Sequence, residues 1–152
     1  MRRSVSILCL VLMITAFRCE KDASFPQDPE WRYFEVGIRD VNTENWRDSS
    51  FVVATKNPAV LERIAAQLAL PVAERNKHVA GGLAKGHGGY NKNSSHYFSW
   101  HLKEDDWDLV DVSVEVTDGR PYTDVDRNYA YWMNTLKRFT PWGSYIKREI
   151  MK

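Results

Sequence analysis

A histidine and two carboxylates form the candidate catalytic site of this sequence: His101, Asp111 and Glu115. A histidine held by a carboxylate can act as a general base, and Ser99 or Ser113 would supply a hydroxyl. No nucleophile elbow and no metal-ligand spacing surrounds these residues in the sequence. The alternative is a solvated sheet face that carries one cross-strand charge pair.

These side chains meet only if residues 97–118 form a β-hairpin. Two segments in this range alternate between apolar and polar residues, as strands with one buried face do. Their apolar faces coincide when Trp100 lies opposite Val112, and that register places His101 opposite Asp111. The sequence therefore predicts a hairpin with Trp100 in the core and the candidate site on its polar face.

A second set of residues could bind a partner without catalysis. It combines the glycine-rich loop with the C-terminal region: Tyr90, Asn91, Lys137, Arg138 and Trp142. No acid occurs between positions 127 and 148, and basic residues mixed with aromatic ones can bind a polyanion, an acidic helix or a lipid surface. The alternative is a C-terminal helix whose cations complement its macrodipole and whose rings pack on the sheet.

Metal and phosphate sites are not indicated. The four histidines, at positions 78, 87, 96 and 101, include no closely spaced pair, so we predict no metal and no cofactor. Gly81 and Gly86 have the spacing of a phosphate-binding loop, but His87 and Gly88 stand where Lys and Ser or Thr are required.

The elements that position these residues follow from periodicity and capping. Strands are predicted over 31–38, 51–55 and 78–85, besides the hairpin. The Gly81-Gly82 pair inside the third strand predicts a bulge or a close backbone approach. Helices are predicted at about 58–69, between Pro58 and Pro71, and at 123–138, opened by a capping box from Thr123 to Asp126. We expect an α+β fold, a mostly antiparallel sheet with both helices packed on one face.

The N-terminal residues predict export. Arg2 and Arg3 precede an apolar run over 5–17 that is too short for a comfortable membrane span. Cleavage after Ala16 and lipidation of Cys19 are both open, and an uncleaved anchor is the remaining alternative. The expected organisation is a leader over 1–19, a proline-containing linker over 20–30 and a single α+β domain over 31–150.

The charge of the mature chain argues against nucleic acid as a partner. The whole sequence has 21 basic and 20 acidic residues. Removing the leader takes away three arginines and no acid, which leaves a net charge of about −2. Bulk attraction to a polyanion is therefore absent, and we predict no nucleic-acid partner.

Short motifs between Phe51 and Trp142 carry a family resemblance. They are Phe51-Val-Val-Ala-Thr-Lys-Asn-Pro-Ala, His78-Val-Ala-Gly, Tyr90-Asn91, Phe98-Ser-Trp-His-Leu, Val114-Glu-Val-Thr-Asp-Gly and Arg138-Phe-Thr-Pro-Trp-Gly-Ser. In these motifs the chain resembles the BP-seventy-four N-terminal-module family of small exported domains, whose relatives are often labelled calmodulin-binding. The resemblance covers about two-thirds of the chain. It implies an exported domain but no activity, because the family has no assigned catalytic residues.

The chain departs from the family in two ways. Thr117 and Thr140 stand where the resemblance places Cys in relatives, which implies that relatives close a disulfide there and that this chain has lost both halves. The loop over 86–97 also looks longer than in relatives.

We therefore expect a non-enzymatic, exported binding module, secreted or membrane-anchored by lipid at Cys19. Its expected partner is a protein, a glycan or a membrane surface, with calmodulin indicated only by the family label. The alternative is a small hydrolase that uses His101 and Asp111 on the polar sheet face. A concave pocket over that face would favour the hydrolase, whereas a flat, exposed face would favour the module.

Overall fold

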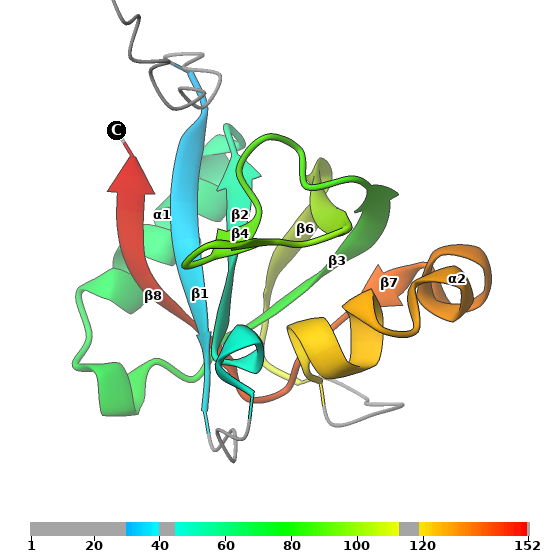
Figure 1. Ribbon diagram of the computed structural model, residues 1–152. Coiled ribbons are helices and arrows are strands. Elements are labelled where there is room, and N and C mark those ends of the chain that lie inside the picture. Colours follow the sequence, from blue (N-terminus) through cyan, green and yellow to red (C-terminus); the bar gives the residue numbers. More distant parts are fainter. Residues whose placement is uncertain (1–29, 40–44, 113–118, 152) are drawn as a thin grey trace, which may run out of the picture.

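The computed structural model describes residues 30–39, 45–112 and 119–151. In these residues the fold is α+β: two three-stranded antiparallel sheets, a two-stranded hairpin and a few short helices (Figure 1). The predicted fold class is thus confirmed, although the strands divide between two sheets instead of forming one.

The first sheet, called sheet A, has the strand order β2-β1-β8. It consists of β1 (Arg32–Ile38), β2 (Ser50–Thr55) and β8 (Ser144–Met151). The predictions for β1 and β2 are confirmed, whereas the sequence analysis placed no strand at β8. Phe34 and Val36 point to an inner face that packs in the core, and Tyr33 and Glu35 point to the opposite, outer face.

The second sheet, called sheet B, has the order β6-β3-β7. Its strands are β3 (His78–Lys85), β6 (Trp100–Val110) and β7 (Arg138–Phe139). The register shifts between Gly81 and Leu83, which confirms the predicted irregularity. A Cβ on Gly81 would collide with Cβ of Trp107, so β3 and β6 approach too closely there for any larger residue.

The predicted hairpin is wrong. β6 runs without a turn through the acidic link, and it pairs with β3: His101 lies opposite Ala84, and Val110 lies opposite His78. The physical reason is that the residues on both sides of the link over 103–106 pair with β3, and the link has aspartates but no Gly for the positive backbone angle of a tight turn. The residues of the link lie as a bulge in β6, opposite the step from Gly81 to Leu83 in β3.

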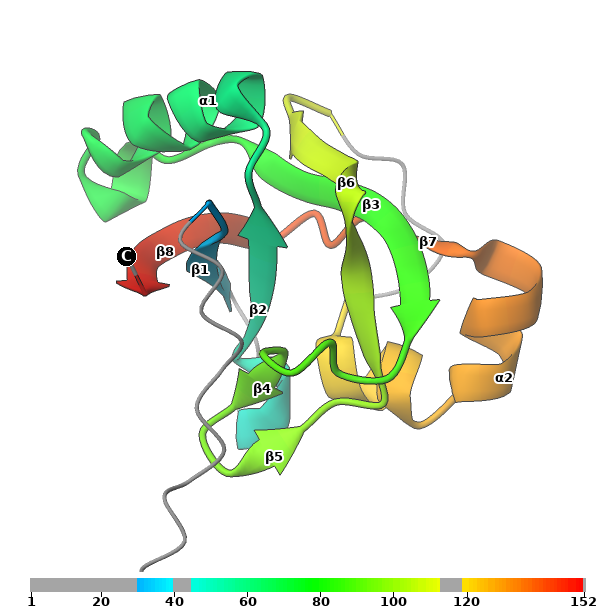
Figure 2. The same cartoon turned by 90° about the horizontal axis from the view of Figure 1, so that it is seen from above.

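The first predicted helix is confirmed as α1 (Pro58–Leu68). The side chain of Asn57 caps it by accepting a hydrogen bond from the amide of Ala59 at 3.0 Å, and Pro58 occupies the first turn. Val60 and Ile64 pack from one side of the helix into the core. In Figure 2, α1 covers one end of the two sheets and the β4–β5 hairpin lies at the other end.

The second predicted helix is broken into short turns. These are the π-helical turn η3 (Pro121–Asp126), α2 (Tyr129–Tyr131) and the π-helical turn η4 (Trp132–Leu136). The predicted capping box is wrong, because Thr123 lies inside η3 and its hydroxyl donates to Asp48 at 2.5 Å. Val125 and Trp132 nevertheless reach the same core as α1.

An aromatic cluster fills the space between the sheets, and Trp100 lies at its centre, as predicted. Its ring centroid is 5.5 Å from that of Phe51 and 5.3 Å from that of Phe139. The indole nitrogen donates to the carbonyl of Pro121 at 3.2 Å, so the one polar atom of this fully buried side chain is satisfied.

The facing edges of the two sheets, β2 and β6, are joined by side chains. The Oδ1 atom of Asn91 accepts from the amide of Val52 at 2.9 Å, and its Nδ2 atom donates to the carbonyl of Trp100 at 2.8 Å. The indole of Trp107 donates to the carbonyl of Ala54 at 2.7 Å. Backbone groups at a sheet edge that would otherwise lack partners are thereby satisfied.

Several predictions fall outside the described residues. These are the leader with Cys19, most of the linker, Ser113, Glu115 and Thr117, and hence the comparison of Thr117 with Thr140. Within the described part of the chain, no helix has the length and apolar character to cross a membrane.

Candidate functional site

The predicted catalytic residues do not come together. His101 lies near the start of β6 and Asp111 just beyond its end, a separation on the order of 30 Å along a strand. Asp111 is exposed and pairs with Lys77, and Glu115 lies outside the described residues. The predicted contact between His101 and Asp111 is therefore wrong, while a catalytic role for any one of them stays a prediction.

His101 instead belongs to a cluster with Tyr90 and Glu104. Its Nδ1 atom lies 2.7 Å from the carbonyl of Gly86, and its Nε2 atom lies 3.6 Å from Oε1 of Glu104. The Tyr90 hydroxyl donates to the same Glu104 oxygen at 2.9 Å. Burial, together with the charge of Glu104, raises the pKa of Tyr90, so this phenol stays protonated and acts as a fixed hydrogen-bond donor.

The predicted binding residues lie in two separate regions. Tyr90 and Asn91 are buried, and their polar atoms are used to hold the loop over 86–97 against the sheets. Lys137 and Arg138 lie at β7, where Arg138 pairs with Asp106 at 2.9 Å, and Trp142 is exposed in the turn that follows. The structure therefore does not bring these five residues into one site.

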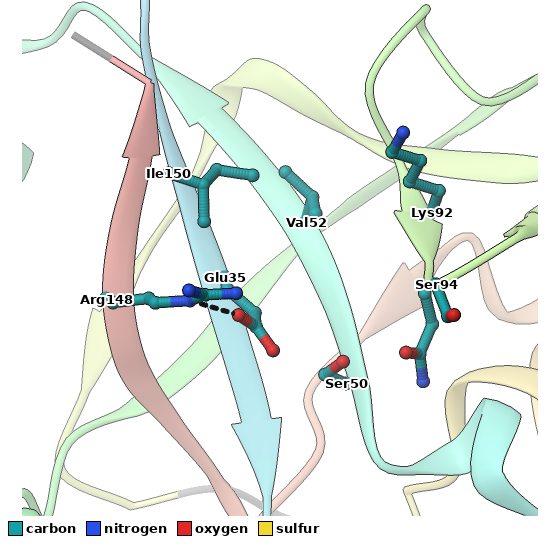
Figure 3. A pocket seen from close by; sticks show the side chains of 8 residues that line it. Glu35, Ser50, Val52, Lys92, Ser94, Arg148 and Ile150 are labelled. Atoms are coloured by element: carbon teal, nitrogen blue, oxygen red, sulfur yellow. Dashed lines mark hydrogen bonds and ion pairs between the residues drawn. The ribbon is translucent and has the colours of Figure 1, made fainter.

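A pocket of about 300 Å³ opens on the outer face of sheet A (Figure 3). Strands β1, β2 and β8 contribute one part of it, and the hairpin of β4 (Lys92–Asn93) and β5 (His96–Tyr97) contributes the other. Its lining is Glu35, Ser50, Val52, Lys92, Asn93, Ser94, Arg148 and Ile150. The loop that the sequence analysis considered longer than in relatives thus forms a wall of the pocket.

The polar centre of the pocket floor is Glu35. Arg148 donates to Glu35 through Nε at 2.6 Å, and Lys147 donates through Nζ at 2.8 Å. Burial alone would raise the pKa of Glu35, but these two cations outweigh it and hold the pKa below its ordinary value. Glu35 is therefore ionised at neutral pH, and the two cations together exceed its charge.

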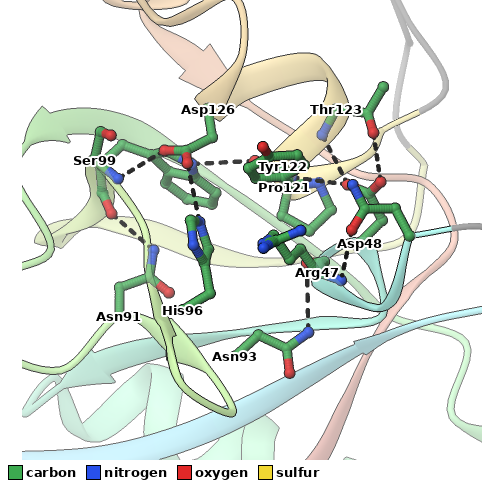
Figure 4. Close-up of polar contacts among 12 residues, drawn as sticks. Arg47, Asp48, Asn91, Asn93, His96, Ser99, Pro121, Tyr122, Thr123 and Asp126 are labelled. Atoms are coloured by element: carbon green, nitrogen blue, oxygen red, sulfur yellow. Dashed lines mark hydrogen bonds and ion pairs between the residues drawn. The ribbon is translucent and has the colours of Figure 1, made fainter.

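The opposite wall is fixed by Asn93. Its Nδ2 atom donates to the carbonyl of Trp46 at 2.8 Å and to Oγ of Ser49 at 3.0 Å, which ties the hairpin to the turn before β2 (Figure 4). Lys92 lies beside it, with Nζ 5.4 Å from the ring centroid of Tyr97. The wall is thus a rigid support that presents an amide and an ammonium group.

The chemistry of this pocket is suited to binding. It offers cationic and hydroxyl donors beside the apolar side chains of Val52 and Ile150. Among the residues that the structure describes, no cluster of His, Cys, Asp or Glu could hold a metal ion. The arrangement can therefore bind a small ligand that combines an anionic group with an apolar part.

This site was not predicted from the sequence. Glu35, Lys92 and Arg148 come from three distant segments and form no local motif. One signal was present: Glu35 is a charged residue in the middle of an otherwise apolar strand pattern, where it must either face solvent or find cationic partners.

A comparison with known proteins identifies the domain. The family model of the BP-seventy-four N-terminal domain matches residues 31–152, a range that contains every strand and helix named above. No curated protein and no solved structure matches the chain. The match confirms the resemblance in the short motifs and extends it to β1 and β8, two of the strands of sheet A that line the pocket. The chain belongs to the family of the BP-seventy-four N-terminal domain.

Proposed function

We propose that the chain is an exported, non-enzymatic binding module whose pocket on sheet A takes a small ligand with an anionic group. The observation that carries this proposal is the position of Arg148, whose guanidinium lies across the pocket floor (Figure 3). Only its Nε atom bonds Glu35, and no described residue accepts a hydrogen bond from its two terminal nitrogens. These two terminal nitrogens can therefore bind an incoming carboxylate or phosphate end-on, through two parallel hydrogen bonds.

The remaining lining supports the same ligand class. Lys92 adds a second cation from the opposite wall, and Asn93 and Ser94 add hydrogen-bonding groups. Val52 and Ile150 provide an apolar surface for the body of the ligand. An organic anion from a partner protein, an acidic glycan or a lipid headgroup would meet these requirements.

We do not propose the hydrolase alternative, because no observation favours it. The hydrolase hypothesis needed the polar face of the predicted hairpin. That face does not form, because β6 is one continuous strand. His101 is in addition directed to the carbonyl of Gly86 and to Glu104.

The binding proposal is tested with benzoate and with uncharged benzyl alcohol, two probes of similar shape. In a ¹H–¹⁵N NMR titration we expect benzoate to shift the amides of Val52, Asn93 and Arg148 saturably, and benzyl alcohol to leave them unchanged. Arg148→Gln should weaken benzoate binding about tenfold, because it removes a charge-assisted contact of roughly 1.5 kcal/mol.

The matched control is Arg127→Gln, which neutralises an exposed arginine outside the pocket. It should leave the affinity for benzoate unchanged. Equal shifts with both probes, or unchanged affinity in Arg148→Gln, would rule out anion recognition by this pocket.

Export is part of the proposal and rests on the charged and apolar residues that precede the polar linker. Mass spectrometry of the protein from its native host should detect no intact Met1. A diacylglyceryl mass on Cys19 would support lipid anchoring, while a free N-terminus at Phe17 would support cleavage after Ala16. Detection of the intact N-terminus would contradict a cleaved leader.

A further inference from the structure

Arg47 occupies an unusual position between two aromatic rings. Its guanidinium carbon lies 4.8 Å from the ring centroid of Trp46 and 5.0 Å from that of Tyr122. Figure 4 shows Arg47 beside Tyr122. The backbone on which it stands is fixed, because its amide donates to Asn45 and its carbonyl accepts from Asn93. The side chain is thus held in one orientation by elements that come from three parts of the chain.

The guanidinium has no anionic partner among the described residues. Its Nε atom is buried and makes no hydrogen bond, and no described residue accepts one from the terminal nitrogens. Only the Nε atom is both buried and without a hydrogen bond, so the two terminal nitrogens of Arg47 reach the surface. A buried guanidinium nitrogen without a hydrogen-bond partner is uncommon in native structures and calls for an explanation.

The two carboxylates labelled in Figure 4, those of Asp48 and Asp126, are committed to other partners. Oδ1 of Asp48 accepts from the amides of Tyr122 and Thr123, both at 2.8 Å, and its Oδ2 accepts from the Thr123 hydroxyl. Asp126 accepts from the amide of Ser99 at 2.7 Å and lies 3.0 Å from Nε2 of His96. Both carboxylates hold η3 in place, and neither bonds the arginine.

We propose that Arg47 anchors an oxyanion-binding site, separate from the pocket on sheet A. The terminal nitrogens of a guanidinium bind a carboxylate or a phosphate through two parallel hydrogen bonds. The two ring contacts restrict the side chain before a ligand arrives, which reduces the entropy lost on binding. Trp46 is 43% exposed, so its ring is available to contact the body of the ligand.

The site does not depend on the proposed function. Arg47 does not line the pocket, and Asn93, which does, contacts Arg47 only through the arginine's carbonyl. The two sites can therefore be occupied and disabled independently. A ligand with two anionic groups, or two different anions, could use both.

The test is an NMR titration of the wild-type protein with sodium phosphate and with sodium acetate, with sodium chloride used to hold the ionic strength constant. We expect one or both oxyanions to shift the Nε–Hε resonance of Arg47 and the indole resonance of Trp46 saturably. Two charge-assisted hydrogen bonds correspond to a dissociation constant on the order of 1 mM. Binding of phosphate alone would identify a phosphate ester as the source, and binding of acetate a carboxylate.

Variants then test whether the NMR shifts arise from an anion bound at Arg47. Arg47→Gln should abolish the saturable shift of the Trp46 resonance, and Arg47→Lys should weaken binding at least several-fold, because a lysine lacks the planar fork. Arg127→Gln and Arg148→Gln should leave the saturable shift of the Trp46 resonance unchanged. The Arg148→Gln result separates this site from the pocket on sheet A. Equal shifts with chloride, an absent shift of Arg47 in the wild type, or full affinity in Arg47→Lys would overturn the proposal.

Discussion

The two faces of sheet A serve different purposes, although they are built from the same three strands. The inner face carries Phe34, Val36 and Val53, all fully buried against α1 and sheet B. The outer face, one residue out of phase, carries Glu35 between Val52 and Arg148. The alternation of side chains along a strand thus lets a small domain place its core on one side of a sheet and its charged, ligand-accessible groups on the other.

The outer face is not simply a solvated surface. Tyr33, Val52, Ala54 and Tyr90 form a second buried cluster where the loop over 86–97 covers the sheet. The pocket occupies the part of the face that this loop borders but leaves open. The loop thus converts half of a sheet face into a sheltered site, and it does so with a modest hydrophobic contribution of its own.

Replacement of a core residue should have the largest effect on stability. Trp100 is fully buried and contacts Phe51 and Phe139, so Trp100→Ala should lower the free energy of unfolding by about 3–5 kcal/mol. Chemical denaturation followed by circular dichroism measures this loss. The control is Trp142→Ala, whose side chain is half exposed and should contribute much less. Equal losses in the two variants would contradict the assignment of the core.

Removal of the side chain that joins the two sheet edges should have an intermediate effect. Asn91→Ala leaves the amide of Val52 and the carbonyl of Trp100 without partners in a buried position, which should cost about 2–4 kcal/mol. Hydrogen exchange should also show faster exchange of the Val52 amide than in the parent. Asn128→Ala, at an exposed position, is the matched control. Unchanged protection of Val52 would show that the loop is not needed to hold the outer face.

The elements that sequence reasoning located correctly carry their signals locally. α1 begins at Asn57 and Pro58, and a cap and a first-turn proline are recognisable without knowledge of the fold. The strand over 78–85 and its glycine irregularity were likewise readable from a few adjacent residues. The hairpin failed because two apolar stretches separated by a polar link fit both a turn and a bulged, continuous strand, and only pairing with β3 decides between them.

The site could not be predicted for a related reason. Glu35, Lys92 and Arg148 become neighbours only when β8 returns to pair with β1 and the loop folds over β2. β8 itself was missed because an acid-free stretch of basic and aromatic residues also fits a helix. Arg47 gave no sequence signal, because Tyr122 lies far from it in the chain and because the hydrogen bonds that occupy the adjacent Asp48 form only in the folded protein.

The smallest effect should come from the charge cluster on the outer face, and it should depend on pH. The pKa of Glu35 is lower in the folded protein than its ordinary value near 4.3, so ionised Glu35 stabilises the fold at neutral pH. That contribution is fully present above the ordinary pKa and is lost as the pH falls through the lower pKa of the folded state. Arg148 and Lys147 are largely exposed, so solvent screening limits the contribution to about 1 kcal/mol or less.

Urea denaturation of Glu35→Gln at neutral pH and at roughly pH 3 measures this term. At neutral pH the variant should be slightly less stable than the parent, and the difference should shrink on acidification, because the parent alone loses the charge at position 35. Glu62→Gln is the matched control, since Glu62 lies exposed on α1 and should follow the parent at both pH values. Other carboxylates titrate in every variant, so only the difference between variants reports on Glu35. If Glu35→Gln instead runs parallel to the parent across this range, the ionised form of Glu35 contributes nothing to folding stability.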